Sequence, residues 1–331
     1  MSRPSSRSAA LFVVVASTAF ATSGPLARYA RPLDPLWIAA GRCGLAGLVL
    51  LAWERAGVLA SLRGMTARQR WAVAGAGALL AAHFGLFLVG LDRTSLPAAV
   101  SLVSLEPLGV VLCAWALSGI RPTRLELVGV ALATGGAGIV ATGAGTGEHR
   151  LDGDLLVLAA VLLFGFYVSA ARGLRDALPA RSYAAVVYSV AAVTLAIAAP
   201  LVPARAGTVG WPVPVHAALA VVALALVPTL IGHTAVQTAA RTLSPSTVAL
   251  ASPGETLGGI LIGAVSLGAI PTGTEIAGAL VIVAGATVAV LGAPSPRHPL
   301  QAGEDGASPR LAIVESPRAS KPGNDPLSRG G

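Results

Sequence analysis

One segment of this chain occurs twice, and this repeat constrains the fold more than any other feature of the sequence. Ser95–Ala144 aligns without a gap on Ser244–Ala293. The matched positions include Glu106 with Glu255, Pro122-Thr123 with Pro271-Thr272, Glu126 with Glu275, and four pairs of glycines, Gly109 with Gly258, Gly119 with Gly268, Gly129 with Gly278 and Gly136 with Gly285. An internal repeat sets the architecture of a chain, so two related halves are expected.

The composition is that of a membrane protein. Of the 331 residues, 54% are hydrophobic and 11% are charged, whereas soluble proteins carry about 25% charged residues. Helices are the form that satisfies the backbone of such segments in lipid. Each of ten apolar runs is long enough to cross a hydrocarbon core of about 30 Å: 9–27, 35–53, 71–91, 95–118, 125–143, 154–172, 182–202, 215–237, 245–268 and 274–292. The sequence therefore predicts an all-α membrane protein with ten transmembrane helices.

The expected organisation has five parts: an N-terminus at 1–8, a first five-helix repeat at 9–144, a linker at 145–153, a second repeat at 154–293 and a tail at 294–331. The tail is rich in Pro, Ser, Gly and charge, which predicts disorder. Ala19-Phe20-Ala21 resembles a signal-peptide cleavage site. However, Phe20 and Arg28 match Phe164 and Arg172 of the second half, which favours a helix that is retained.

The distribution of arginine predicts the orientation. Ten spans place both termini on one side, and twelve arginines outside the tail fall on that side, against five in the opposite loops. Because cytoplasmic loops are enriched in Lys and Arg, both termini are expected in the cytoplasm. Five helices per half is an odd number, so the two repeats should be inverted relative to each other in a plasma or inner membrane.

Several functions are not supported by the sequence. The formal net charge of +8 does not indicate nucleic-acid binding, because the arginines lie in short loops and not along one face. Cys43 and Cys113 lie in apolar segments and are expected to be buried thiols. No metal-ligand spacing, nucleophile–base pair or nucleotide-binding loop is present, so neither a cofactor nor an enzyme is expected.

Ionisable residues inside the apolar runs are the first candidates for a functional site. A charge near the bilayer centre costs at least ~2.5–3.5 kcal/mol, so such residues are usually functional or paired. Glu106 and Glu255 occupy equivalent depths in two runs, where a carboxyl that loses water can hold and release a proton. Arg42 stays charged and is expected to pair with a glutamate, to cap carbonyl groups or to bind a substrate carboxylate. Helix packing remains the alternative for all three.

The two glutamates differ in their neighbours. Pro107 follows Glu106, whereas Pro253 precedes Glu255, so their surroundings should differ. We expect Glu106 to be the main proton carrier, with an open face formed by the small residues Gly109 and Cys113. Glu255 is expected to be its structural partner, ion-paired with Arg42.

Further polar residues complete the candidate site. His233 and Gln237 form a stripe with Thr229 at helical spacing. His83 is a lone histidine in the third run, Thr22 shares a face with Thr18 and Pro25, and Tyr167 and Ser169 occupy the equivalent stretch of the sixth run. Gly24-Pro25 should break the first helix and open backbone groups toward a cavity. Core packing is the alternative for each of these residues.

Inverted repeats are typical of secondary transporters, whose substrate site lies near the bilayer midplane between the repeats. The motifs resemble the EamA-type branch of the drug/metabolite transporter superfamily over about 9–292: Leu105-Glu106-Pro107-Leu108, Pro122-Thr123-x-x-Glu126-x-x-Gly129, Gly135-Gly136, Ser252-Pro253-Gly254-Glu255, Glu275-x-x-Gly278 and Leu36-Trp37-Ile38-Ala39-Ala40-Gly41-Arg42. The resemblance implies efflux of a small metabolite, and the glutamates indicate proton antiport. Protons, the lipid bilayer and a small-molecule substrate are thus the expected partners, together with a homodimer. The alternatives are a non-transporting scaffold or sensor with a transporter fold, and an intramembrane enzyme.

Overall fold

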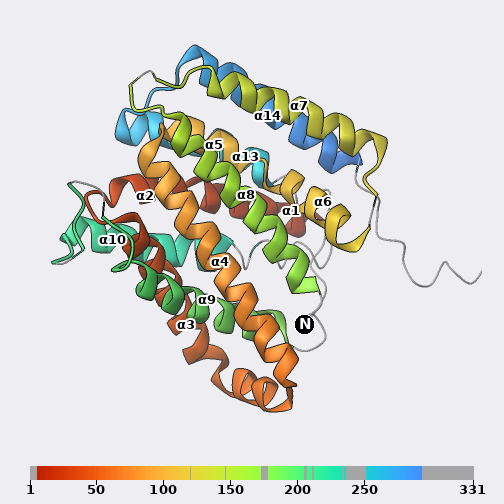
Figure 1. Ribbon diagram of the computed structural model, residues 1–331, viewed down its shortest axis with the longest axis vertical. Helices are drawn as coiled ribbons and strands as arrows, with labels where there is room; N and C mark the ends of the chain where they lie inside the picture. The colour runs from red at the N-terminus through yellow and green to blue at the C-terminus, as the bar shows by residue number, and fades with distance from the viewer. Residues whose placement is uncertain are drawn as a thin grey trace, which may run out of the picture. The chain divides into compact units, whose positions relative to one another are not determined.

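The described part of the chain is almost entirely helical (Figure 1). The computed structural model describes residues 6–119, 121–145, 147–172, 178–204, 207–210, 212–232, 235 and 251–292. The helices are α1 (Ser6–Ala21), α2 (Ser23–Tyr29), α3 (Pro35–Gly64), α4 (Ala67–Arg93), α5 (Leu96–Val103), α6 (Glu106–Ser118), α7 (Arg124–Ala141), α8 (Leu151–Arg172), α9 (Ala180–Ala198), α10 (Val215–Leu224), the π-helix η1 (Ala225–Gly232), α13 (Ala251–Leu267) and α14 (Gly273–Gly292). Within these ranges, β pairing is limited to an isolated bridge between Leu33 and Val209.

The helices confirm the predicted class of fold. Nine helical stretches of the described residues are long and apolar enough to cross a membrane, and Gly254–Leu267 is a shorter apolar helix. Five of these ten segments belong to each half of the chain. The start predicted for the ninth run, residues 245–250, lies outside the described residues, as does the tail at 294–331.

Three prolines determine where membrane helices are interrupted. A proline has no amide hydrogen, so the carbonyl four residues earlier loses its helical donor. Pro25, Pro107 and Pro228 would leave the carbonyls of residues 21, 103 and 224 without that donor. Accordingly α1 ends at Ala21, α5 ends at Val103 and α10 gives way to η1 after Leu224. The expected break in the first helix is therefore present, and it falls at Thr22, before Gly24-Pro25.

The second helix is longer than predicted. Its apolar run ends near residue 53, but α3 continues to Gly64, with non-helical dihedral angles at Glu54. Beyond this kink, Arg181 of α9 lies 3.4 Å from the Glu54 carboxylate. Hydrophobicity marks only the part of a helix that faces lipid, so the sequence did not reveal the polar extension.

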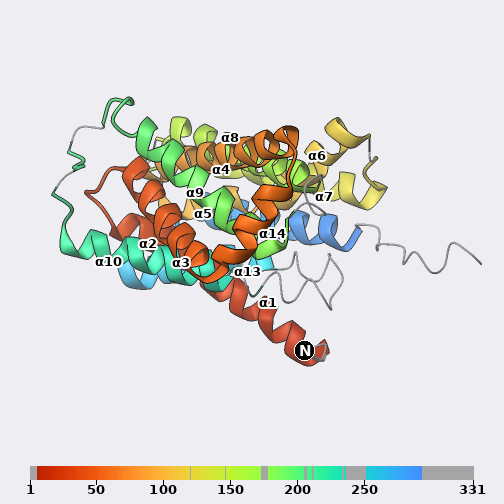
Figure 2. The same ribbon diagram turned by 90° about the horizontal axis from the view of Figure 1, so that it is seen from below.

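The packing of helices repeats itself when the two halves are exchanged. The contact of α1 with η1 corresponds to that of α4 with α8, and the contact of α1 with α13 corresponds to that of α6 with α8. The equivalent helices α3 and α9 pack on each other, as do α7 and α14, which lie side by side in Figure 1. Figure 2 shows α2 beside α10, and α2 also contacts α13. Elements of both halves therefore surround the interrupted helices.

Candidate functional site

Arg42 lies at the meeting point of these interrupted helices. Its side chain is buried on α3, and its Nη1 donates to Ser23 Oγ of α2 at 3.1 Å. Its Nε and Nη2 donate to Thr229 Oγ1 of η1 at 3.3 and 3.1 Å. Both partners are neutral hydroxyl groups. The structure thus holds a permanent positive charge in the membrane interior without a neutralising carboxylate in direct contact, among the residues described.

Thr229 connects this cation to the helix break that Pro228 creates. Its hydroxyl donates to the carbonyl oxygen of Leu224 at 2.8 Å. Pro228 removes the α-helical donor of this oxygen, and the π-helix that follows offers it the amide five residues further on instead. The hydroxyl oxygen of Thr229 also accepts from Arg42. The break therefore positions the acceptor for the guanidinium.

An aromatic bridge joins Arg42 to the first candidate glutamate. The guanidinium carbon lies 4.4 Å from the centre of the Phe84 ring, a distance at which cations are attracted to the ring face. The neighbouring His83 is buried on α4, and its Nε2 lies 3.6 Å from Oε1 of Glu106. His83 Nδ1 lies 2.9 Å from the carbonyl oxygen of Ala160. Arg42, His83 and Glu106, predicted separately, therefore belong to one cluster.

Glu106 is the first residue of α6, just after the break in the fourth span. The amide groups at a helix N-terminus favour negative charge there. Two residues earlier, the hydroxyl of Ser104 contacts that of Thr256, which follows Glu255 on α13, and both hydroxyls are buried. This contact joins the break before Glu106 to α13, the helix that carries Glu255. Hydroxyl pairs of this kind have no sequence signal, because each residue alone is a common helix constituent.

Two expectations about the glutamates are wrong. Among the described residues, Arg42 forms no ion pair with Glu255; the two charges interact only at longer range. The face of α6 beside Glu106 is also not open. A Cβ atom added at Gly109 would lie 2.8 Å from the carbonyl oxygen of Val161, and Cys113 Sγ lies 3.7 Å from the carbonyl oxygen of Leu162. Small residues here allow α8 to approach closely.

The remaining candidates divide into three groups. Tyr167 lies near the cluster, since its ring is 6.1 Å from that of Phe164, which is 5.2 Å from that of His83. Thr22 instead donates back to the carbonyl oxygen of Ala19 at 2.7 Å, and the adjacent Ser23 contacts Arg42. His233 and Gln237 lie outside the described residues. The stripe predicted for them therefore stays a prediction, and Thr229, its described member, lies in the π-helix η1.

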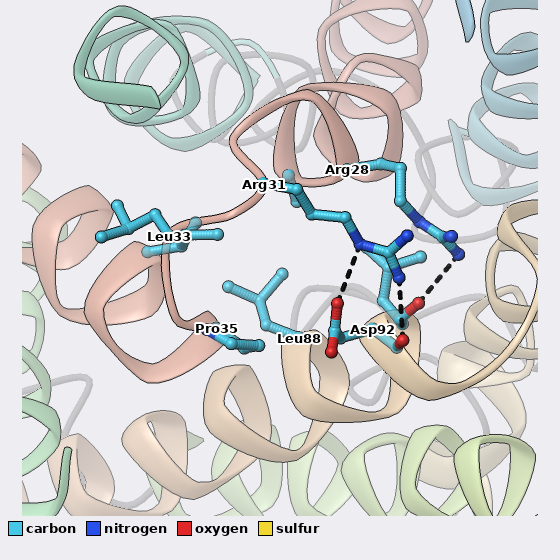
Figure 3. A pocket seen from close by; sticks show the side chains of 9 residues that line it. Arg28, Arg31, Leu33, Pro35, Leu88 and Asp92 are labelled. Carbon is cyan, nitrogen blue, oxygen red and sulfur yellow. Dashed lines mark hydrogen bonds and ion pairs between the residues drawn. The ribbon is translucent and has the colours of Figure 1, made fainter. Parts of the chain in front are cut away.

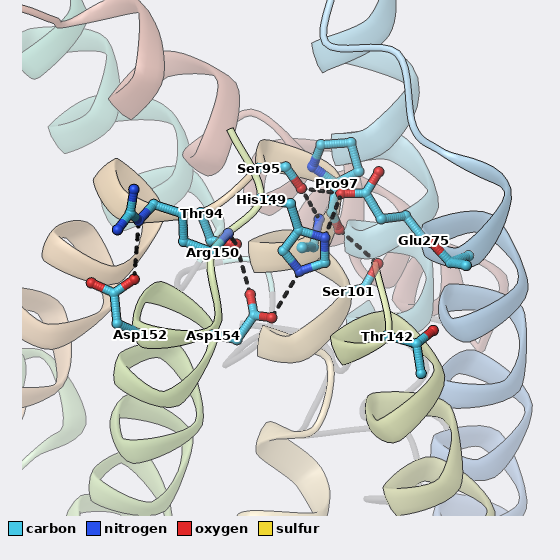
Figure 4. A network of polar contacts seen from close by, with 12 residues as sticks. Thr94, Ser95, Pro97, Ser101, Thr142, His149, Arg150, Asp152, Asp154 and Glu275 are labelled. Atoms are coloured by element: carbon cyan, nitrogen blue, oxygen red, sulfur yellow. Dashed lines mark hydrogen bonds and ion pairs between the residues drawn. The ribbon is translucent and has the colours of Figure 1, made fainter. Parts of the chain in front are cut away.

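A second buried polar network lies between the repeats and was not predicted (Figure 4). His149 of the linker lies 2.8 Å from Oδ2 of Asp154 and 3.5 Å from Oε1 of Glu275, and all three are buried. Thr94 donates to Asp154 at 2.7 Å, and Ser95 donates to Glu275. No sequence signal singles out His149.

The matched pair Glu126 and Glu275 proves to be a pair of helix caps. Each accepts the backbone amide of a threonine three residues earlier, Thr123 at 2.6 Å and Thr272 at 2.7 Å. The pattern Thr-x-x-Glu before an apolar run is the sequence signature of this capping box. The sequence of the repeat therefore contains the signal for both caps.

Two inverted groups of membrane helices, with ionisable side chains buried at interrupted helices, are typical of secondary transporters. The model of the EamA-like transporter family matches residues 7–142 and 151–291. The chain therefore belongs to the EamA-like transporter family, within the drug/metabolite transporter superfamily, and is a multi-pass membrane transporter of small molecules.

The structural comparison supports the same fold. A solved structure described as "Crystal structure of protein" resembles the chain with a TM-score of 0.60 and 23% sequence identity, covering 86% of this chain and 97% of its own. No curated protein matches the sequence.

Proposed function

We propose that the protein is a secondary active transporter that exports a small polar or amphipathic metabolite, such as an amino-acid-like compound, in exchange for protons. The observation that carries the proposal is the buried Arg42, whose contacts are the neutral Ser23 and Thr229. A packing role would favour a carboxylate partner, because an unneutralised charge in the membrane is costly.

The chemistry of Arg42 supports a substrate with a carboxylate group. A guanidinium presents five N–H donors in a planar fork that matches a carboxylate. Three of its contacts are to hydroxyl oxygens, which a charged substrate group can replace with a gain in attraction. Glu106 and Glu255 would then face the cationic end of an amino-acid-like substrate, or hold protons in its absence.

Proton coupling is assigned mainly to Glu106. Its carboxyl group lies 3.6 Å from Nε2 of His83, an imidazole that can donate or accept a proton. We further propose a plasma or inner membrane with both termini in the cytoplasm, an orientation that directs export toward the side of the linker. A homodimer is part of the proposal, and the mass of the detergent-solubilised protein tests it.

The experiment is a flux assay with purified protein in liposomes that carry an imposed pH gradient. A panel of labelled amino acids and neutral amines is supplied on one side, with protein-free liposomes as the control. Uptake that depends on both the protein and the gradient is expected for a compound with a carboxylate group. Protein-dependent flux that ignores the gradient would contradict proton antiport, and flux of neutral amines alone would contradict the role given to Arg42.

A further inference from the structure

We infer that α2 is a gate of the transport path, because this short helix contacts the Arg42 site at one end and, at the other, is held by ion pairs with the inter-repeat linker and the end of α4. The inference rests on the proposed transport function. It assigns a role to Arg28, Arg31, Asp92 and Glu148, which we call the α2 latch.

The inner end of α2 is attached to the candidate site. Ser23, its first residue, accepts a hydrogen bond from Arg42 at 3.1 Å. A substrate that takes over this guanidinium donor would release Ser23. A change of charge at the site therefore acts directly on α2, through one hydrogen bond.

The other end of α2 is held by the latch, of which Figure 3 shows Arg28, Arg31 and Asp92. Arg28 donates to the carbonyl oxygens of Leu91 and Thr94, at 2.9 and 2.6 Å, at the end of α4. It also forms an ion pair with Glu148 of the linker. Arg31 follows the helix and donates to Asp92 Oδ1 at 2.8 Å, with Glu148 at 3.5 Å.

The linker is a fixed anchor for this latch. Glu148 precedes His149, which is buried between Asp154 at the start of α8 and Glu275 at the start of α14 (Figure 4). Both helices belong to the second repeat. The ion pair of Arg28 with Glu148 therefore joins the first repeat to the second.

The geometry of α2 suits a moving element. The helix is 7 residues long and is separated from α1 by the break at Thr22. It packs against α10, α13 and the side of α5, where a Cβ atom added at Gly24 would lie 3.0 Å from both Leu96 and Val100. The Nε–H group of Arg28 is buried without a hydrogen-bond partner in the described residues, so the latch holds α2 without satisfying every donor. Hinges are commonly a few residues at the end of an element.

The test measures access to a residue that α2 covers. Val100 is buried between Gly24 of α2 and Gly259 of α13, and cysteine has nearly the volume of valine. Val100→Cys is made in a chain that lacks the two native cysteines (C43A/C113A). Its rate of labelling by a membrane-impermeant methanethiosulfonate reagent is measured with the reagent on the linker side and on the opposite side. No substrate is required.

Glu148→Gln removes the anchor charge from a side chain that is 66% exposed, so folding should be preserved. We expect a two- to fivefold faster labelling from the linker side, about the effect of losing a largely solvated ion pair. The matched control is Asp152→Asn, which removes an acidic group 52% exposed that pairs with Arg93 and Arg150 and not with α2. Its labelling rate should stay unchanged.

A second variant, Arg28→Gln, also loses the bonds to Leu91 and Thr94 and should label faster than Glu148→Gln. Unchanged labelling in both variants, or an equal rise in Asp152→Asn, would overturn the gate. If the unaltered protein shows no flux in liposomes while the latch variants still label faster, the transport function fails but the movement of α2 stands.

Discussion

Gly129 of α7 and Gly285 of α14 pack backbone against backbone. A Cβ atom added at Gly129 would lie 2.5 Å from the carbonyl oxygen of Gly285, and one added at Gly136 would lie 2.9 Å from that of Gly278. In the repeat, Gly129 corresponds to Gly278 and Gly136 to Gly285. Gly129 thus meets the equivalent of Gly136, and Gly136 meets the equivalent of Gly129. A two-fold axis between antiparallel helices produces this exchange, which identifies the two halves as inverted copies.

The first prediction concerns this contact. Gly129→Ala should lower stability by about 1–3 kcal/mol, because the added methyl group must displace backbone atoms. The control is Gly135→Ala on the same helix, where an added Cβ meets nothing within 4 Å. That variant should be neutral or slightly more stable, by up to ~1 kcal/mol, since alanine favours helix over glycine. Thermal unfolding in detergent compares the two, and equal midpoints would contradict the close contact.

The second prediction separates function from packing at Arg42. Arg42→Met should abolish substrate flux and leave the thermal midpoint unchanged or higher, because a buried charge replaced by an apolar group of similar size removes a desolvation cost. Arg42→Lys keeps the charge but loses the planar fork, so it should retain a small part of the flux. A marked loss of stability in Arg42→Met would make Arg42 a packing residue.

The third prediction concerns the hydroxyl of Thr229. Thr229→Val should destabilise the protein by about 1–3 kcal/mol, because the buried guanidinium of Arg42 loses a hydrogen-bond acceptor and the carbonyl of Leu224 loses one of its donors. Thr194→Val is the control: Thr194 donates at 2.9 Å to the carbonyl of Val190 within α9, which has no such interruption. Its thermal midpoint should change little. A similar shift in both variants would show that η1 does not depend on Thr229.

The fourth prediction assigns the proton. Glu106→Gln should abolish stimulation of flux by a pH gradient with near-normal stability, because glutamine has nearly the same shape but cannot carry a proton. Glu255→Gln should retain part of the stimulation. Glu106 lies 3.6 Å from the imidazole of His83, whereas Glu255 has no such proton-exchanging partner among the described residues. Gradient-driven flux of an identified substrate measures both. Equal losses would refute the division of roles between the two glutamates.

The fifth prediction is the orientation of the chain. Reporter fusions should report a cytoplasmic location after Ala293 and a location across the membrane at Gly147, because arginine is enriched in the loops on the side of the termini. Gly147 lies in the linker that carries the α2 latch. The opposite pair of signals would reverse both the topology and the direction of export.

The sequence alone determined the class of fold, the two related halves and the approximate limits of the membrane segments. Hydrophobic run length and the repeat are properties of local sequence, and lipid enforces helices wherever such runs occur. The same local chemistry determines the helix interruptions, because Pro25, Pro107 and Pro228 each remove one amide donor at a known position. Arg42, His83 and Glu106 were identifiable one by one, because charge and imidazole are rare in apolar segments.

Only the tertiary structure decided which of these residues meet. Arg42 contacts Ser23 and Thr229 instead of Glu255, and α8 covers the face of α6 that the small residues were expected to leave open. His149 is buried between two carboxylates that lie far apart from each other in the sequence. Such pairings depend on how closely helices approach and which way each face turns. Those quantities arise from packing of the whole bundle, and no single stretch of the chain contains them.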